Sequence, residues 1–192
     1  MSKETIASML AQLKDLSEMM VDLAYSALLF GSEEVADHVI DMEKTMEILH
    51  TEFEFAILGL REERPINGLL GILRIGGAAK SLASAATTIA DIVKRGVRAH
   101  PVIQLALERS DETIIVATVA PNSNVVGKAI KELGLEDDIG MHIVAVKSGD
   151  YWTYNPASSF KLNIGDLVIA HGYAEGREKF LNLIDPSRIH PA

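Results

Sequence analysis

The chain has 192 residues, of which 48% are hydrophobic and 23% charged, and its formal net charge is −9. This composition is typical of a globular protein with a buried core, and the length fits one medium domain or two small ones. An acidic chain without a basic stripe offers little electrostatic support for binding nucleic acid or an anionic membrane surface. The chain has no cysteine, which excludes disulfides and thiolate metal ligands and fits a cytoplasmic location.

The N-terminus and the most apolar stretch both argue against a membrane segment. The opening sequence MSKETIASMLAQLKDL lacks the cationic start and continuous apolar run of a signal peptide. The apolar stretch at 69–93 contains Arg74, Lys80 and Asp91. Each of these charges costs about 2.5–3.5 kcal/mol at the middle of a membrane. We therefore predict a soluble protein with no direct membrane insertion.

In the first half, apolar residues recur in alternating steps of three and four, the period of a buried helix face. Gly31 interrupts the pattern, and Ser32 is suited to cap the helix that follows. The three runs are Met9, Leu13, Leu16, Met20, Leu23, Ala27 and Phe30; Val35, Val39, Met42, Met46, Leu49, Phe53, Ala56 and Leu60; and Leu69, Ile72, Ala79, Leu82, Ala86, Ile89 and Val93. Short connections make neighbouring helices antiparallel, so the sequence predicts an antiparallel three-helix bundle over residues 1–97.

A change of period predicts a second domain. Residues 98–112 form a linker, in which Pro101 starts a short helix that ends near Arg109. Beyond the linker, β-branched segments and turn residues predict a small α/β domain over 113–192 with the order β-α-β-β-β-α. The expected strands lie at 113–119, 141–146, 151–154 and 167–170, and the expected helices at 125–133 and about 174–184. The fold class is therefore α+β with two domains.

Several motifs of the second half resemble the TrkA-C domain, the C-terminal half of the RCK modules that regulate potassium channels and transporters. The similarity covers about 113–184. Its motifs are Asn124-Val125-Val126-Gly127-Lys128, Leu133-Gly134-Leu135, Ile143-Val144-Ala145-Val146 and Ile164-Gly165-Asp166-Leu167-Val168. The helical half resembles one three-helix unit of a PhoU protein, through its helix lengths and the Ile89-Ala90-Asp91 ending of the third helix.

The resemblance implies a non-enzymatic regulator of cation transport, most often of potassium. It implies a homodimer that holds a small ligand and acts on a membrane channel or transporter present as a separate chain, with no cofactor. The Gly-x-Gly-x-x-Gly loop of the nucleotide-binding RCK half is missing, as is the Gly-x-Ser-x-Gly motif of hydrolases. Two alternatives stay open: a PhoU-like adaptor in phosphate transport signalling, and a metal-binding protein.

The metal alternative depends on acidic residues of the helical half. PhoU proteins bind metal through an acidic pair on the third helix, and the resemblance aligns that pair with Lys80 and Ser84, so no metal is expected there. The remaining candidates are Glu33, Asp37 and Asp41, spaced four residues apart on the second predicted helix. Two such carboxylates could hold a hard cation weakly, but a solvated acidic face explains the same row.

The ligand alternative depends on residues that the resemblance places in a pocket between two subunits. Some TrkA-C domains bind cyclic di-AMP there, and the matching positions are Glu136, His142 and Pro156, of which only the proline agrees with the family pattern. The neighbouring Leu135 and Ile143 could line an apolar pocket. The family pattern has an arginine at Glu136 and an asparagine at His142. A guanidinium binds phosphate through two hydrogen bonds, whereas a carboxylate repels it. The sequence thus disfavours cyclic di-AMP and leaves open a pocket for another ligand or a plain dimer interface.

Overall fold

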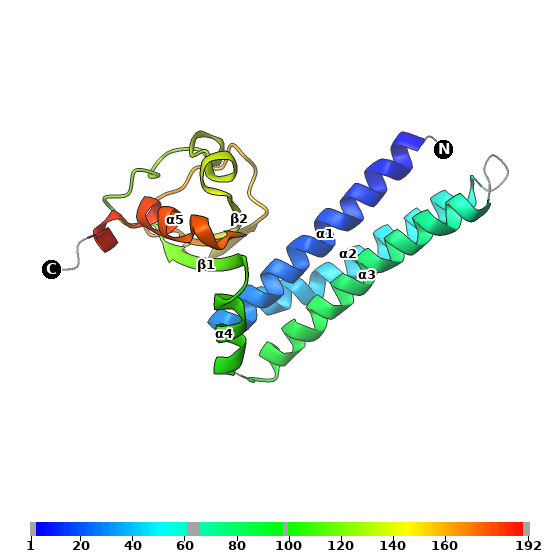
Figure 1. Ribbon diagram of the computed structural model, residues 1–192, viewed down its shortest axis with the longest axis horizontal. Helices are drawn as coiled ribbons and strands as arrows, with labels where there is room; N and C mark the ends of the chain where they lie inside the picture. The colour runs from blue at the N-terminus through cyan, green and yellow to red at the C-terminus, as the bar shows by residue number, and fades with distance from the viewer. Residues whose placement is uncertain (1–2, 61–65, 98–99, 190–192) are drawn as a thin grey trace. The chain divides into compact units, whose positions relative to one another are not determined.

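The structure is a computed structural model that describes residues 3–60, 66–97 and 100–189. The chain divides into two compact units, Met1–Arg98 and Ala99–Ala192. The first unit is entirely helical and the second contains a sheet (Figure 1). Residues 98–99, where the linker is predicted to begin, lie outside the described part of the chain.

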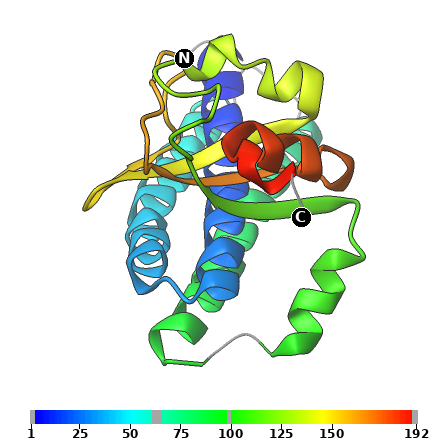
Figure 2. The ribbon, with the colours of Figure 1, turned by 90° about the vertical axis from the view of Figure 1, so that its left-hand side faces the viewer.

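The first unit is a three-helix bundle, as predicted. Its helices are α1 (Lys3–Phe30), α2 (Glu33–Leu58) and α3 (Ile66–Lys94), which lie side by side in Figures 1 and 2. Gly31 takes a φ of 66° in the turn between α1 and α2, a conformation that glycine adopts without strain. The next residue, Ser32, caps α2, because its side-chain oxygen accepts a hydrogen bond from the Val35 N–H at 3.4 Å.

The bundle core combines large side chains from two helices with small ones from the third. Residues fully buried from α1 and α2 include Leu13, Met20, Leu23, Met46 and Phe53. The buried face of α3 is lined mainly by Gly76, Ala79, Ala83, Ala86 and Ala90. A face this flat lets α3 pack closely against both neighbours.

The orientation of α3 corrects one expectation. The apolar period places Leu82 on the buried face, but its side chain is 52% exposed. The small residues of α3 face the core instead, and several of its large residues face outward.

By length and composition alone, α3 could span a membrane over Gly68–Lys94. The core helix of a soluble protein satisfies the same criterion. Lys80 and Lys94 on this helix form ion pairs with carboxylates of α2, an arrangement suited to a water-exposed groove between packed helices.

The second unit is built on a four-stranded antiparallel sheet with the order β1-β4-β2-β3. Its strands are β1 (Glu112–Thr118), β2 (Met141–Ser148), β3 (Tyr151–Tyr154) and β4 (Leu167–Tyr173). Helix α4 (Pro101–Glu108) precedes the sheet. A short 3-10 turn, η3 (Ala174–Gly176), leads into α5 (Arg177–Ile184), which is followed by a second 3-10 turn, η4 (Pro186–Ile189). The predicted strands and terminal helix are confirmed.

The helix predicted at 125–133 is wrong. This segment consists of turns and a 3-10 helix, η1 (Ile130–Glu132), and a π-helix, η2 (Leu135–Ile139), follows it. The reason is an alternative set of backbone partners. Gly127 has a φ of 76° and donates its N–H to Leu162 O at 2.7 Å, and Ala129 forms a β-bridge with Lys161. Backbone groups that pair with a distant segment cannot also complete the i to i−4 ladder of an α-helix.

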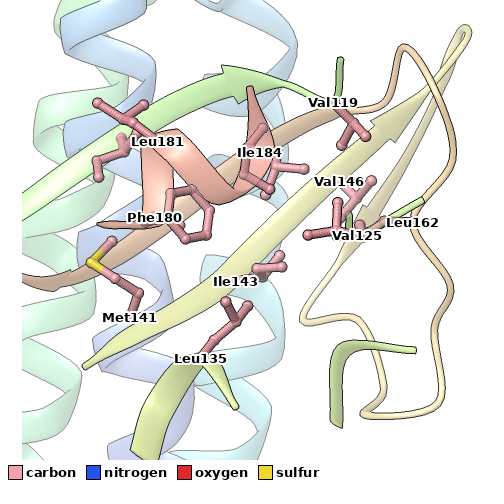
Figure 3. Packing of buried hydrophobic residues seen from close by; sticks show 13 residues of the cluster. Val119, Val125, Leu135, Met141, Ile143, Val146, Leu162, Phe180, Leu181 and Ile184 are labelled. Carbon is pink, nitrogen blue, oxygen red and sulfur yellow. The ribbon is translucent and has the colours of Figure 1, made fainter. Parts of the chain in front are cut away.

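The core of the second unit lies between the sheet and α5 (Figure 3). Phe180, Leu181 and Ile184 of α5 are each at most 2% exposed and pack on the same face of the sheet as Met141 and Ile143 of β2. Leu135 of η2 belongs to the same cluster and thus fastens the π-helix to the core.

Two adjacent glycines of α3 give opposite predictions for the same substitution. A β-carbon at Gly76 would overlap the ring of Phe53, which is fully buried and cannot move aside, whereas one at Gly77 would meet no atom within 4 Å. Gly76→Ala should lower the free energy of unfolding by about 1–3 kcal/mol, because overpacking outweighs the gain in helix propensity. Gly77→Ala should raise it by about 0.5–1 kcal/mol. Urea unfolding of both variants measures the difference, and equal effects would contradict the close Gly76–Phe53 packing.

Candidate functional site

The predicted ligand residues lie around η2, whose position is fixed by glycines. Gly134 and Gly140 flank the π-helix and both adopt left-handed backbone conformations, with φ of 58° and 72°. On the facing side, a β-carbon at Gly172 of β4 would overlap the Gly140 carbonyl, and one at Gly176 would overlap the Ile139 carbonyl. Backbone therefore packs directly on backbone here, and η2 is held firmly against the end of β4.

Glu136 and His142 form a direct side-chain contact at this position. Glu136 lies in η2 and His142 is the second residue of β2, and Glu136 Oε1 lies 2.6 Å from His142 Nδ1. An ionised carboxylate only accepts hydrogen bonds, so we assign the proton to Nδ1 as the donor. The side chains are 71% and 52% exposed, so the pair can meet a ligand from solvent.

A second pair of the same kind lies next to the first. His142 of β2 is the direct cross-strand neighbour of His171 on β4, so the two imidazoles share one face of the sheet. His171 Nε2 lies 3.5 Å from Glu112 Oε2 on β1. We call Glu136, His142, His171 and Glu112 the His–Glu row. Its two imidazoles and two carboxylates offer hydrogen-bond donors and acceptors to a polar ligand.

The other predicted pocket residues have different positions. Leu135 and Ile143 are 3% and 2% exposed and belong to the hydrophobic core behind the row. Pro156 is buried beyond β3, next to Asn155, whose N–H donates to Val144 O at 2.8 Å. The structure thus brings Glu136 and His142 together and makes Leu135 and Ile143 their support. A ligand pocket at these five residues stays a prediction.

Sequence reasoning missed His171 and Glu112. They are 59 positions apart in the sequence, and only the pairing of β4 with both β1 and β2 brings them beside His142. The sequence of β4, LVIAHGY, begins with four consecutive apolar residues and shows no polar–apolar alternation, so no local pattern indicates the strand register that places His171 beside His142.

The Gly165-Asp166 motif of the family resemblance has a structural role. Asp166 is 4% exposed, and its carboxylate accepts hydrogen bonds from Ser148 Oγ and Asn163 N, both at 2.7 Å. Gly165 has a φ of 84° in the same turn. The motif therefore ties the end of β2 to the turn that precedes β4.

The acidic row on α2 is paired with lysines. Lys94 Nζ lies 2.8 Å from Asp37 Oδ2 and 3.5 Å from Glu33 Oε2, and Lys44 Nζ lies 2.9 Å from Asp41 Oδ1. The hydrogen bond to Asp37 raises the pKa of Lys94, and the hydrogen bond from Lys44 lowers the pKa of Asp41. Within the described part of the chain, no three ligating side chains converge as a metal site would require.

Lys80, which stands where the PhoU resemblance expects an acidic metal ligand, is also paired. Its Nζ lies 2.8 Å from Glu47 Oε2, and this hydrogen bond raises the pKa of the lysine. A fixed positive charge at this position opposes cation binding on α3.

The bundle and the antiparallel sheet with its terminal helix correspond to two regulatory, non-catalytic classes of domain. Residues 10–94 match the PhoU domain, and residues 114–185 match the TrkA-C domain. The chain therefore combines an N-terminal PhoU domain with a C-terminal TrkA-C domain, as the sequence motifs indicated.

One relative of part of the chain is a potassium channel protein. A segment of 67 residues, 35% of this chain, is 31% identical to Potassium channel protein 1 of Methanocaldococcus jannaschii and covers 20% of that protein. The chain thus spans about a fifth of this relative. Its TrkA-C domain is related to those of potassium transport regulators.

Solved structures with a similar fold include three complexes. The RCK_C domain dimer of S. agalactiae BusR with c-di-AMP is 20% identical and covers 38% of this chain and 96% of its own, with a TM-score of 0.36. The RCK C domain of the potassium transport protein KtrA with c-di-AMP is 22% identical and covers 43% and 94%, with a TM-score of 0.35. S. agalactiae BusR with its busAB-promotor DNA is 16% identical and covers 99% and 100%, with a TM-score of 0.37.

In these complexes cyclic di-AMP is bound to BusR and KtrA, and DNA is bound to BusR. For this chain, weak binding of cyclic di-AMP and the absence of nucleic-acid binding stay predictions.

The buried carboxylate of Asp166 gives a stability prediction. Asp166→Ala leaves the Ser148 hydroxyl and the Asn163 N–H without their acceptor, and should lower the free energy of unfolding by about 1–3 kcal/mol. Asp150→Ala, at an exposed position in the β2–β3 turn, should change it by less than about 0.5 kcal/mol. Chemical denaturation followed by circular dichroism compares them. Equal stability of the two variants would contradict the structural role of Asp166.

Proposed function

We propose that this protein is a cytoplasmic, non-enzymatic regulator of cation transport, most directly of potassium transport. The observation that supports this proposal most strongly is the match of residues 114–185 to the TrkA-C domain. A segment of 67 residues that is 31% identical to a potassium channel protein supports it further. The protein works as a homodimer through this domain, senses a small ligand, and acts on a membrane channel or transporter that is a separate chain. The PhoU domain supplies a surface for assembly.

The proposed ligand site is the His–Glu row. It lies on the rigid ends of three strands, and its member on η2 is held by a backbone that packs on Gly172 and Gly176. A polar ligand can exchange its own hydrogen bonds for the contact between Glu136 and His142 without disturbing the core below them. A rigid support of this kind reduces the entropy that binding must overcome.

The test of the proposed function compares two kinds of uptake. Deletion of the gene should change uptake of rubidium, a potassium analogue, and leave uptake of phosphate unchanged. A change confined to phosphate would instead favour the second candidate, a PhoU-like adaptor in phosphate transport signalling, which the PhoU match at 10–94 supports. Complementation with the Glu136→Gln, His142→Gln double variant should fail to restore the response if ligand sensing depends on the row.

Charge reversal at Glu136 tests the ligand prediction with cyclic di-AMP as the probe. Glu136 carries a negative charge beside His142, so the unmodified protein should bind this dianion weakly. Glu136→Arg supplies a bidentate phosphate donor and should raise the affinity at least about tenfold in calorimetry. Asp137→Arg is the matched control, because it makes the same change of charge at the neighbouring exposed position of η2. Equal gains in both variants, or tight binding by the unmodified protein, would contradict the placement of Glu136 at the site.

A further inference from the structure

Helix α3 carries two heptad patterns on two different faces. One is the small-residue face buried in the bundle. The other is outside the core and also advances in steps of four and three; we call it the α3 stripe. It consists of Gly71, Ile75, Ala78, Leu82, Ala85, Ile89 and Ile92. Three of its four large residues are open to solvent, with Ile75 57%, Leu82 52% and Ile92 38% exposed, and the fourth, Ile89, is half-buried.

The order of residues in the α3 stripe is nearly the same in both directions. Leu82 is at the centre, alanines stand on either side of it, and isoleucines stand beyond them at 75 and 89. A two-fold axis through Leu82 would place Ile75 of one copy opposite Ile89 of another and Ala78 opposite Ala85. Large residues then meet large ones, and small residues meet small ones. Such self-complementarity is what a two-fold interface between identical chains requires.

We propose that the α3 stripe pairs with the α3 stripe of a second copy of this chain, in antiparallel orientation about a two-fold axis at Leu82. The heptad spacing keeps the stripe in contact with its partner along the whole helix. The alanines beside Leu82 let the two backbones approach closely. The occupant of this apolar face is therefore another α3, and the face is an interface between protomers.

Charge favours the antiparallel orientation over the parallel one. The stripe contains no charged residue, and within α3 (Ile66–Lys94) the charged residue beside it is the exposed Arg74. Parallel pairing would place the two Arg74 side chains next to each other. Antiparallel pairing separates them by about 24 Å, twice eight residues at a rise of about 1.5 Å each. This exceeds the Debye length of about 8 Å at physiological salt, so their repulsion is screened.

The size of the stripe limits how strong the contact can be. From Gly71 to Ile92 the stripe is about 32 Å long and about 10 Å wide, or roughly 640 Å² for both copies together. Stable interfaces bury about 1,200–2,000 Å². The α3 contact therefore needs a second contact to hold it, and for its strength the proposal rests on the TrkA-C dimer of the proposed function. Two chains joined there present their α3 stripes to each other at a high effective concentration.

Cysteine cross-linking of the full-length chain tests the pairing, since the natural sequence contains no cysteine. Leu82→Cys places one thiol from each copy at the two-fold axis and should form a disulfide-linked dimer under mild oxidation. Ser84→Cys is the control: it is exposed on the same helix, two residues away, and points to a different side. We expect at least tenfold more cross-linked dimer from Leu82→Cys than from Ser84→Cys. Equal yields would overturn the proposal.

A second pair of variants tests the orientation without changing Leu82. Ile75→Cys mixed with Ile89→Cys should yield the mixed disulfide, and each variant alone should yield little. Self-linked Ile75→Cys would mean a parallel pair and would overturn the antiparallel arrangement. Circular dichroism melts of all variants under reducing conditions confirm that they are folded.

Light scattering on the reduced, unmodified protein separates this proposal from the proposed function. A dimer with no preferential Leu82→Cys cross-link would overturn the α3 pairing and leave the TrkA-C dimer intact. A monomer would overturn the dimeric assembly of the proposed function. Flotation with neutral lipid vesicles that is abolished by Leu82→Glu would assign the stripe to a lipid surface and overturn the pairing.

Discussion

The close approach of α3 to its two neighbours is the constraint on which the helical domain depends. Gly76 allows the ring of Phe53 to lie directly on the α3 backbone, and the alanines along the same face leave room for methionine and leucine side chains from α1 and α2. Because the core is filled mainly from these two helices, α3 contributes large residues to it only near its ends, at Leu69 and Val93. Ile75, Leu82 and Ile92 are left on the outside, where they belong to the α3 stripe. The small residues on the inner face of α3 thus determine how closely the bundle packs, and the large residues on its outer face make that surface apolar.

Glycine has a parallel role in the TrkA-C domain. The backbone of β4 and η3 packs against the end of η2 because Gly172 and Gly176 have no β-carbon. This contact sets the height of η2 above the sheet, and with it the reach of Glu136 toward His142. The motif residue Asp166 fixes the other end of β2 in a similar way, through a buried carboxylate. The ligand candidates of the sequence are thus of two kinds. Leu135 and Ile143 belong to the core beneath the site, whereas Glu136 and His142 face solvent.

The sequence predicted the positions of the helices and strands better than it predicted which residues are buried and which segments pair. Strands rich in β-branched residues were predicted to within three residues, because short runs of such residues between turn residues favour a strand over a helix. The helix at 125–133 was wrong because its backbone bonds to residues 158–162, a partner that no local pattern indicates. Leu82 was assigned to the core because both heptads of α3 are apolar, and periodicity does not show which one faces inward. Residue size does, since only the Gly/Ala face fits beside Phe53.

Local sequence patterns also identify only part of the candidate site. Glu136 and His142 are six residues apart, and a family pattern was enough to name both. His171 and Glu112 join them only through strand register, which depends on the whole sheet. Interpreting the acidic row on α2 required its partners as well: Lys94 and Lys44 neutralise carboxylates that, in isolation, resemble a cation site. Local spacing identifies chemical groups, whereas their partners decide what those groups can bind.

A weak contact between α3 helices has a mechanistic consequence for a protein of this architecture. An interface that buried enough area to form by itself would stay closed whatever the TrkA-C domains bind. The stripe, at about half the area of a stable interface, is near balance when the chains are joined elsewhere. Allosteric coupling energies are typically about 1–3 kcal/mol, which is enough to open or close such a contact and too little to separate a strong one. Under the proposed function, a ligand that alters the geometry of the TrkA-C dimer would change the α3 pairing, and a transport protein bound to the PhoU domains would respond to that change.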